Sequence, residues 1–155
     1  MIEIERKFLV KSTGYKKNSL SKHFVKQGYL STDLSRCVRV RIIDEKAFIT
    51  IKGASSIDGL SRFEWEKEIC KKEADEIIML CAADTIEKIR YVLEFDGNKF
   101  EVDEFQNKNN GLIIAEIELS SKNQLFKKPE WIGKEVTGIK KYYNSQLAQK
   151  PFSKW

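Results

Sequence analysis

Hydrophobic and polar residues alternate along most of the chain, beginning with its first stretch. In residues 2–10, apolar side chains take most of the alternate positions, and Glu3, Glu5 and Lys7 lie between them. Successive side chains of a β-strand leave opposite faces, so this pattern predicts a strand with one apolar and one charged face. Taken alone, such a strand is also typical of an ordinary sheet with one face in water.

The same alternation recurs, which makes the chain predominantly β. Strands are expected at 2–10, 25–30, 36–43, 47–52, 61–70, 86–95, 98–105 and 112–119. Asp44-Glu45-Lys46 and Asp96-Gly97 separate neighbouring runs and predict tight hairpins. Helical composition or spacing is found at 15–24, 72–83 and 139–149, whereas 53–60 is expected to be a loop and 129–133 to be irregular.

Strands joined mostly as hairpins form an antiparallel sheet, and closing that sheet into a barrel removes its exposed edges. With the apolar faces turned outward under the helices, the charged faces line the interior, and about eight strands leave room for one small ligand. The expected fold is mainly β (α+β). It is one domain, residues 1–155, built as an eight-stranded antiparallel closed β-barrel with a charged interior and a few flanking helices.

Composition narrows the class of protein. The chain contains no apolar run of the ~18 residues that a membrane helix needs and no secretory signal ahead of Ile2. Cys37, Cys70 and Cys81 are odd in number and lack CxxC spacing, which favours reduced thiols in a cytoplasmic protein and argues against a zinc site. A single histidine, His23, leaves little for histidine-based catalysis. The net charge of +5 permits an anionic partner, but the lysine pairs are scattered and no nucleic-acid-binding motif is present.

Acidic residues two positions apart recur on the charged faces of the expected strands. The pairs are Glu3/Glu5, Glu64/Glu66, Glu101/Asp103 and Glu116/Glu118. Neighbouring carboxylates on one strand face repel each other, so repeating them costs stability unless cations lie between them. Clusters with only oxygen ligands suit hard divalent ions such as Mg²⁺ or Mn²⁺.

Basic residues form a matching set, mostly on strands other than those of the acidic pairs. Arg39/Arg41 and Lys88/Arg90 are pairs, Arg62 precedes Glu64, and Lys52 stands alone. The planar fork of arginine binds phosphate through two donors, so a site with both signs of charge favours a metal-bound polyphosphate. The alternative is a network of salt bridges across an ordinary antiparallel sheet.

The charged motifs of these strands, taken together, resemble those of a known family. Glu3-x-Glu5-x-Lys7 resembles the ExExK signature of the CYTH domain, whose members are also called triphosphate tunnel metalloenzymes. Further matches follow in order over nearly the whole chain: Gln27-Gly28-Tyr29-Leu30, Val38-Arg39-Val40-Arg41, Thr50-Ile51-Lys52-Gly53, Arg62-Phe63-Glu64-Trp65-Glu66, Lys88-Ile89-Arg90-Tyr91, Glu101-Val102-Asp103, Ala115-Glu116-Ile117-Glu118-Leu119, Pro129 with Trp131-Ile132-Gly133, and Glu135-Val136-Thr137. The first motif alone is weak, but the ordered set is specific, and it is most similar to short single-domain bacterial members.

The resemblance implies a charged tunnel inside an eight-stranded barrel, with Mg²⁺ or Mn²⁺ as the cofactor. The implied metal-binding acids are Glu3, Glu5, Glu64, Asp103, Glu116 and Glu118. The implied phosphate ligands are Lys7, Arg39, Arg41, Lys52, Lys88 and Arg90. Arg62, Glu66 and Glu101 share these strand faces and are expected to support the site. Tyr29 is expected to line the tunnel or to pack, and Trp65 and Trp131 are expected to pack.

The expected activity is hydrolysis of inorganic tripolyphosphate, with Glu116, Glu118 and Lys7 as catalytic residues. A second metal ion or the Glu116/Glu118 pair would orient the attacking water. Adenylate cyclase, thiamine triphosphatase and a non-catalytic polyphosphate-binding module remain alternatives. The expected partner is a small polyphosphate, not a nucleic acid or a membrane, and the protein is expected to be a monomer or a homodimer.

Overall fold

The computed structural model describes residues 2–81 and 83–155, which form nine strands and three short α-helices. The strands are β1 (Ile2–Val10), β2 (Ser21–Ser31), β3 (Arg36–Ile43), β4 (Lys46–Ser55), β5 (Ser61–Ile69), β6 (Ile86–Phe95), β7 (Asn98–Phe105), β8 (Ile113–Glu118) and β9 (Ile132–Glu135). The helices are α1 (Gly14–Lys17), α2 (Lys71–Ile78) and α3 (Asn144–Gln149). Short 3₁₀ turns at Asn107–Asn109, Lys140–Tyr142 and Phe152–Lys154 complete the fold.

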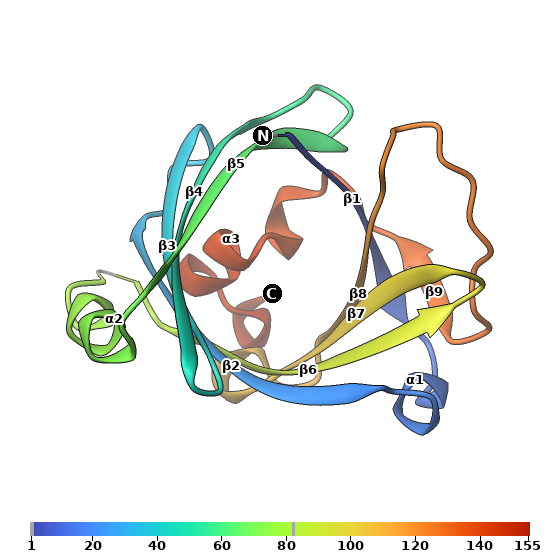
Figure 1. The fold of residues 1–155 in the computed structure, drawn as a ribbon, viewed down its shortest axis with the longest axis horizontal. Helices are drawn as coiled ribbons and strands as arrows, with labels where there is room; N and C mark the ends of the chain where they lie inside the picture. The colour runs from blue at the N-terminus through green and yellow to red at the C-terminus, as the bar shows by residue number, and fades with distance from the viewer. Residues whose placement is uncertain (1, 82) are drawn as a thin grey trace.

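Strands β1 to β8 form a closed antiparallel barrel, which confirms the predicted fold (Figure 1). Neighbours follow the order β5-β4-β3-β2-β6-β7-β8-β1, and β1 returns to pair with β5. Strand β9 pairs with the end of β1 beyond this closing contact. The predicted hairpins are present: Asp96 and Gly97 have φ angles of 50° and 74°, as a type I′ turn requires, and Asp44 has a φ of 50°.

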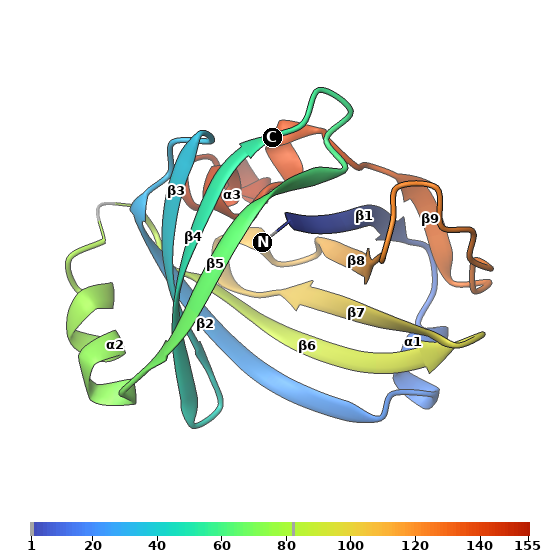
Figure 2. The same ribbon diagram turned by 45° about the horizontal axis from the view of Figure 1, so that its top comes forward.

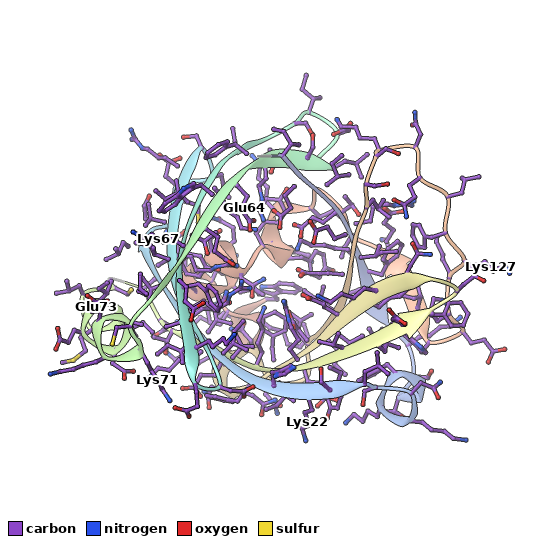
Figure 3. All side chains as sticks on the ribbon, viewed as in Figure 1. Lys22, Glu64, Lys67, Lys71, Glu73 and Lys127 are labelled. Carbon is purple, nitrogen blue, oxygen red and sulfur yellow. The ribbon has the colours of Figure 1, made fainter. Side chains whose placement is uncertain are left out.

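The hydrophobic core lies mainly on the outer face of the barrel wall. Phe8, Phe100 and Trp131 belong to one buried cluster, in which the Phe100 and Trp131 rings pack edge to face, 5.7 Å apart. On the other side, α2 covers Val40 and Ala47. Because the apolar side chains point outward, the alternate positions of the same strands point charged side chains into the lumen. In Figure 3, Glu64 lies within the barrel outline, whereas Lys22 and Lys127 lie at the periphery.

The C-terminal segment covers one end of the lumen. Figure 1 shows α3 within the ring of strands seen down the barrel, and Figure 2 shows it behind β3 and β4. Leu147 on α3 is fully buried in a cluster with Ile86, Phe105 and Leu112. This packing fixes the first residues of α3 against the inside of the barrel.

Several expected elements differ from those in the structure. The helix expected at 72–83 corresponds to α2, which ends at Ile78, and Ala82 lies outside the described residues. The helix expected at 139–149 is divided, because a 3₁₀ turn spans Lys140–Tyr142 and α3 begins at Asn144.

Residues 15–24 are not a helix, because α1 ends at Lys17 and β2 begins at Ser21, where it pairs with Val92 of β6. Pairing to β6 therefore outweighs the local helical composition. Residues 129–133 are only partly irregular, since β9 begins at Ile132.

The remaining expectations about packing and composition are largely met. Trp131 is buried as predicted, whereas Trp65 lies on the outer face and is 39% exposed. Cys37, Cys70 and Cys81 are free thiols. Within the described residues, no helix combines the length and apolar character needed to cross a membrane.

Candidate functional site

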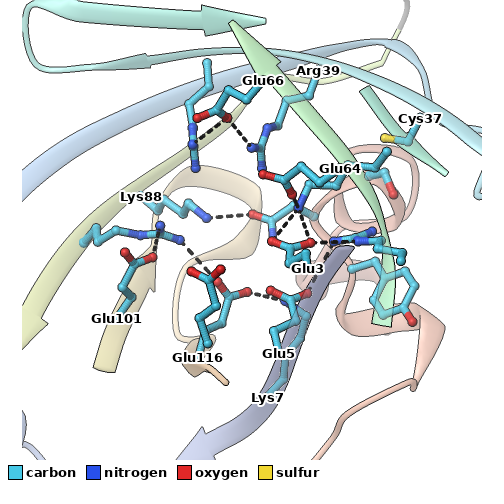
Figure 4. A pocket seen from close by; sticks show the side chains of 18 of the residues that line it. Glu3, Glu5, Lys7, Cys37, Arg39, Glu64, Glu66, Lys88, Glu101 and Glu116 are labelled. Atoms are coloured by element: carbon cyan, nitrogen blue, oxygen red, sulfur yellow. Dashed lines mark hydrogen bonds and ion pairs between the residues drawn. The ribbon is translucent and has the colours of Figure 1, made fainter. Parts of the chain in front are cut away.

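The lumen of the barrel contains a cavity of about 240 Å³ (Figure 4). All six predicted phosphate ligands line it: Lys7, Arg39, Arg41, Lys52, Lys88 and Arg90. Five of the six predicted metal ligands line it as well: Glu3, Glu5, Glu64, Glu116 and Glu118. The four residues expected to support the site, Tyr29, Arg62, Glu66 and Glu101, also contribute to the wall. The structure therefore brings together all but one of the predicted residues.

The register of the strands explains why opposite charges meet. Lys52 on β4 faces Glu64 on β5, and their Nζ and Oε2 atoms lie 2.5 Å apart. Lys7 on β1 faces Glu116 on β8, and the two side chains form an ion pair. Directly opposite residues on antiparallel strands are the closest cross-strand neighbours, so a register slip of one residue would dismantle both pairs.

Lys7 is held between two carboxylates in the wall. Its Nζ lies 3.0 Å from Glu5 Oε1 and also binds Glu116. Burial lowers the pKa of Lys7, but the charges of Glu116 and Glu5 outweigh it, so the pKa is raised overall. Lys7 is therefore cationic at neutral pH. Burial would raise the pKa of Glu116, but Lys7 and Arg90 hold it well below its usual value.

Asp103 is the predicted metal ligand that does not line the cavity. It is 1% exposed, and its Oδ2 accepts from Lys88 Nζ at 2.6 Å and from Arg90 Nη2 at 2.7 Å. Its Oδ1 accepts from Arg90 Nε at 2.7 Å. Burial opposes ionisation, yet Arg90 and Lys88 lower the pKa of Asp103. Both oxygens are thus engaged by the two cations, and its expected role as a metal ligand stays a prediction.

Arg39 and Arg41 carry donors that are not satisfied by the protein. Both guanidinium groups contact Glu66 Oε2, at 3.5 Å and 3.0 Å respectively, yet the Nε atom of each is buried without a hydrogen-bond partner in the described structure. Burial, with Arg39 nearby, lowers the pKa of Arg41 to about 10. Buried cationic donors without acceptors are costly, and an anion in the cavity would supply acceptors.

Glu118, in contrast to the two arginines, is an acidic side chain that lacks a cationic partner among the described residues. It forms no ion pair with any side chain that the structure describes, and burial followed by the charges of Glu3, Glu64 and Glu101 raises its pKa. Its neighbours are thus mainly carboxylates, which is the environment that a divalent cation stabilises.

The carboxylate oxygens of these acids are suitable ligands for a hard divalent ion, but the side chains are not arranged as a preformed metal site. Among residues 2–81 and 83–155, no three acidic, histidine or cysteine side chains are grouped closely enough to hold a metal ion. The carboxylate oxygens of the lining glutamates are instead paired with cations, among them Lys7, Lys52 and Arg62. A bound cation would therefore use Glu118 together with carboxylates that exchange these partners.

Charges in the wall are balanced. The cavity lining carries eight basic and seven acidic side chains, and Asp103 behind it brings the acids to eight. A site of this kind has both donors for an anion and oxygen ligands for a cation, without a net charge that favours either alone.

Several residues of the wall were not predicted. Cys37 and Lys99 also line the cavity, and each lies two positions before a predicted residue on its strand, so the alternation already indicated them. Tyr143, Asn144 and Ser145 line it from the C-terminal segment. No sequence signal indicated these three, because only the packing of α3 brings them to the lumen.

Comparisons with known proteins agree with this geometry. The CYTH domain matches residues 1–150. An inorganic triphosphatase of Acetivibrio thermocellus is 49% identical over 152 residues, which cover 97% of this chain and 95% of that protein. An inorganic triphosphatase of Nitrosomonas europaea is 36% identical over 96% of this chain and 97% of its own length. A crystal structure of an inorganic triphosphatase aligns with a TM-score of 0.68 and 34% identity over 94% of this chain and 93% of that chain. The chain therefore belongs to the CYTH domain family.

Proposed function

We propose that the protein is a divalent-metal-dependent triphosphatase that hydrolyses inorganic tripolyphosphate. The observation that carries this proposal is the small, charge-balanced cavity, which is lined both by arginines with unpartnered donors and by glutamates, of which Glu118 has no cationic partner among the described residues. Lys7, Arg39, Arg41, Lys52, Lys88 and Arg90 bind the phosphate chain. Names of the two relatives and of the solved structure support the same activity.

Charge balance explains the need for a metal ion. A polyphosphate entering this neutral lumen would leave its negative charges uncompensated, because the basic residues are already paired with acids. Binding divalent cations together with the substrate keeps the filled cavity close to neutral. The donor set consists of carboxylate oxygens, which suits Mg²⁺ or Mn²⁺.

Residues of the wall have distinct roles in the reaction. Glu3, Glu5, Glu64, Glu116 and Glu118 would hold the cation, which would neutralise phosphoryl charge and lower the pKa of a bound water. Arg41 and Arg90 orient the phosphate chain, and Lys7 stabilises charge on the phosphoryl group that is attacked. The Glu116/Glu118 pair orients the attacking water. The oxygen of this water bonds to a terminal phosphorus as the bridging P–O bond breaks, which releases orthophosphate and pyrophosphate. One water proton stays on the orthophosphate and the other is released to solvent.

Cavity size and lining favour an inorganic substrate. The volume of about 240 Å³ is below the ~300–1,000 Å³ of pockets for drug-sized ligands. Its aromatic lining residues are Tyr29 and Tyr143, among the described residues. The Tyr29 hydroxyl already bonds Gln27, and the Tyr143 ring lies 5.7 Å from the Arg62 guanidinium carbon. Both side chains are also buried, so little of either ring is available to stack on a nucleobase or a thiazole.

The test compares phosphate release from tripolyphosphate, ATP and thiamine triphosphate, each with Mg²⁺ or Mn²⁺, alongside an assay for cyclic AMP. The proposal predicts the highest kcat/KM for tripolyphosphate and no release in EDTA. Cyclic AMP formation that outpaces tripolyphosphate hydrolysis would overturn it in favour of a cyclase. Tight binding of every substrate without turnover would instead show a polyphosphate-binding module.

A cytoplasmic location follows as part of this proposal. All three cysteines are free thiols. Thiols persist in the reducing cytosol, where disulfides are rare.

A further inference from the structure

A part-buried hydrogen-bond network joins the barrel wall to Asn144, the first residue of α3. Asn144 Oδ1 accepts hydrogen bonds from Lys88 Nζ at 2.9 Å and from Gln27 Nε2 at 3.2 Å. The same Gln27 nitrogen donates to the Tyr29 hydroxyl at 2.7 Å. One side chain of the C-terminal segment thus contacts a predicted phosphate ligand directly.

The contact fixes the ammonium group of Lys88. Lys88 is 2% exposed, and its Nζ donates to Asp103 Oδ2 at 2.6 Å as well as to Asn144 Oδ1. An ammonium group has three hydrogens, so two fixed acceptors leave one donor for a ligand in the cavity that Lys88 lines. A lysine that is already immobilised loses less conformational entropy when the ligand binds.

The amide of Gln27 limits how the network can be arranged. Gln27 is fully buried, and its Oε1 has no hydrogen-bond partner in the described structure. Rotating the amide would turn this oxygen towards Asn144 Oδ1, an acceptor facing an acceptor. The observed orientation therefore leaves an oxygen unsatisfied but keeps Asn144 Oδ1 available to Lys88. Unsatisfied buried polar atoms are rare, and functional sites are among the places where they are retained.

We propose that Asn144 is a positioning residue of the phosphate site. Its Oδ1, set by the packing of α3 and by Gln27, directs the Lys88 ammonium so that the third hydrogen faces the substrate. The inference rests on the proposed triphosphatase function for its kinetic consequence, but the effect on binding tripolyphosphate does not depend on turnover.

The main test is a double-mutant cycle of N144A and K88M, with the Kd of tripolyphosphate measured by calorimetry and the KM and kcat of hydrolysis measured in parallel. We expect N144A to raise Kd and KM about tenfold, the equivalent of about 1.4 kcal/mol, with kcat changed less than threefold. In the K88M background, N144A should change Kd by less than twofold, because the group through which it acts is absent. Equal effects in both backgrounds would overturn the proposal.

Q149A is the matched control. Gln149 lies on the same helix and donates to the Thr32 hydroxyl at 2.5 Å, outside the residues that line the cavity. This variant loses one side-chain bond of α3 and should retain wild-type Kd and KM. If Q149A weakens binding as much as N144A does, the effect belongs to the stability of α3 and the proposal fails.

A second measurement covers the case in which K88M does not fold. In protein with ¹⁵N-labelled lysine, the ammonium signal of Lys88 should exchange slowly with water, and N144A should accelerate that exchange. Unchanged exchange in a folded N144A variant would contradict the proposal. If the wild type binds tripolyphosphate but hydrolyses no triphosphate, the proposed function fails, while the calorimetric cycle still decides the role of Asn144.

Discussion

Arg62 on β5 binds the carboxylates of both Glu3 and Glu5 on β1, and so crosses the line along which the barrel closes. Its Nε lies 3.1 Å from Glu3 Oε2, and its Nη2 lies 3.3 Å from Glu5 Oε1. Burial would lower the pKa of Arg62, but Glu5 and Glu3 raise it. Only three facing residue pairs join β1 to β5 in the described chain, whereas eight join β3 to β4. The ion pairs therefore reinforce the shortest contact of the barrel.

Replacing Arg62 with Met should loosen this closing contact. The substitution keeps much of the side-chain volume but leaves Glu3 and Glu5 with one cationic partner each, Lys52 and Lys7, and we expect this loss to cost about 1–3 kcal/mol. We expect amide exchange to accelerate selectively in residues 2–4 and 61–63, as measured by hydrogen–deuterium exchange with mass spectrometry. R36A is the control, since Arg36 lies at the start of β3 with its side chain 82% exposed. Acceleration spread evenly over all strands would contradict the role of Arg62 at the closing contact.

Arg41 provides the clearest test of a phosphate ligand. Its guanidinium group binds Glu66, and its Nε is buried without a partner. R41A should raise the KM for tripolyphosphate by about 10–100-fold, since a hydrogen bond to a charged group contributes about 1.5–3 kcal/mol. R36A again serves as the control, because it removes an arginine from the same strand outside the cavity. An unaltered KM in R41A would show that this side chain does not contact the substrate.

Glu116 tests the acidic half of the site. E116Q preserves the shape of the side chain but removes the charge that faces Lys7 and Arg90, and it replaces one acceptor oxygen with an amide donor. We expect the metal concentration for half-maximal activity to rise at least about tenfold, because loss of even a residue that only hydrogen-bonds a metal ligand weakens metal binding by that much. E76Q, an exposed change on α2, should behave as wild type. Circular dichroism melts establish that both variants fold, and unchanged metal dependence in E116Q would count against the metal assignment.

Much of the barrel follows from local alternation, and what does not follow depends on contacts distant in sequence. The inward phase of Glu3, Lys7 and Glu116 is visible in the sequence, because the period of a strand is two residues. The pairing of Lys7 with Glu116 is not visible, because it depends on a register between residues 109 positions apart. The place of Asn144 in the cavity wall could not be predicted for the same reason, since only the burial of Leu147 brings α3 to the lumen. The expected helix at 15–24 failed because pairing with β6 overrides weak helical spacing.

Glu135 allows a pH test away from the lumen. Arg6 Nε and Nη2 donate to its two oxygens at 2.7 Å and 2.6 Å, and this pairing lowers the pKa of Glu135. A carboxyl whose folded pKa is lowered stabilises the fold above its unfolded pKa of ~4.3, and the contribution is lost as pH falls through the folded value. Since both side chains are part-exposed, we expect E135Q to destabilise the protein by only about 0.5–1 kcal/mol at pH 6.

The difference between E135Q and wild type should shrink as pH falls from about 5 through the unfolded pKa of ~4.3 towards the lower folded pKa. Urea unfolding at several pH values measures it, with E76Q as an exposed control that changes charge by the same amount. A difference that is constant over this range would show that the Arg6–Glu135 pair does not carry the effect.

We propose that residues lining the charged lumen hydrolyse tripolyphosphate and that this activity requires a divalent metal ion. Phosphorus NMR of tripolyphosphate incubated with the protein tests it most directly, with Mg²⁺ or Mn²⁺ present and then with EDTA. We expect equal amounts of orthophosphate and pyrophosphate, formed only with metal and strongly reduced in E116Q. A tripolyphosphate spectrum that stays unchanged with both metals would contradict it.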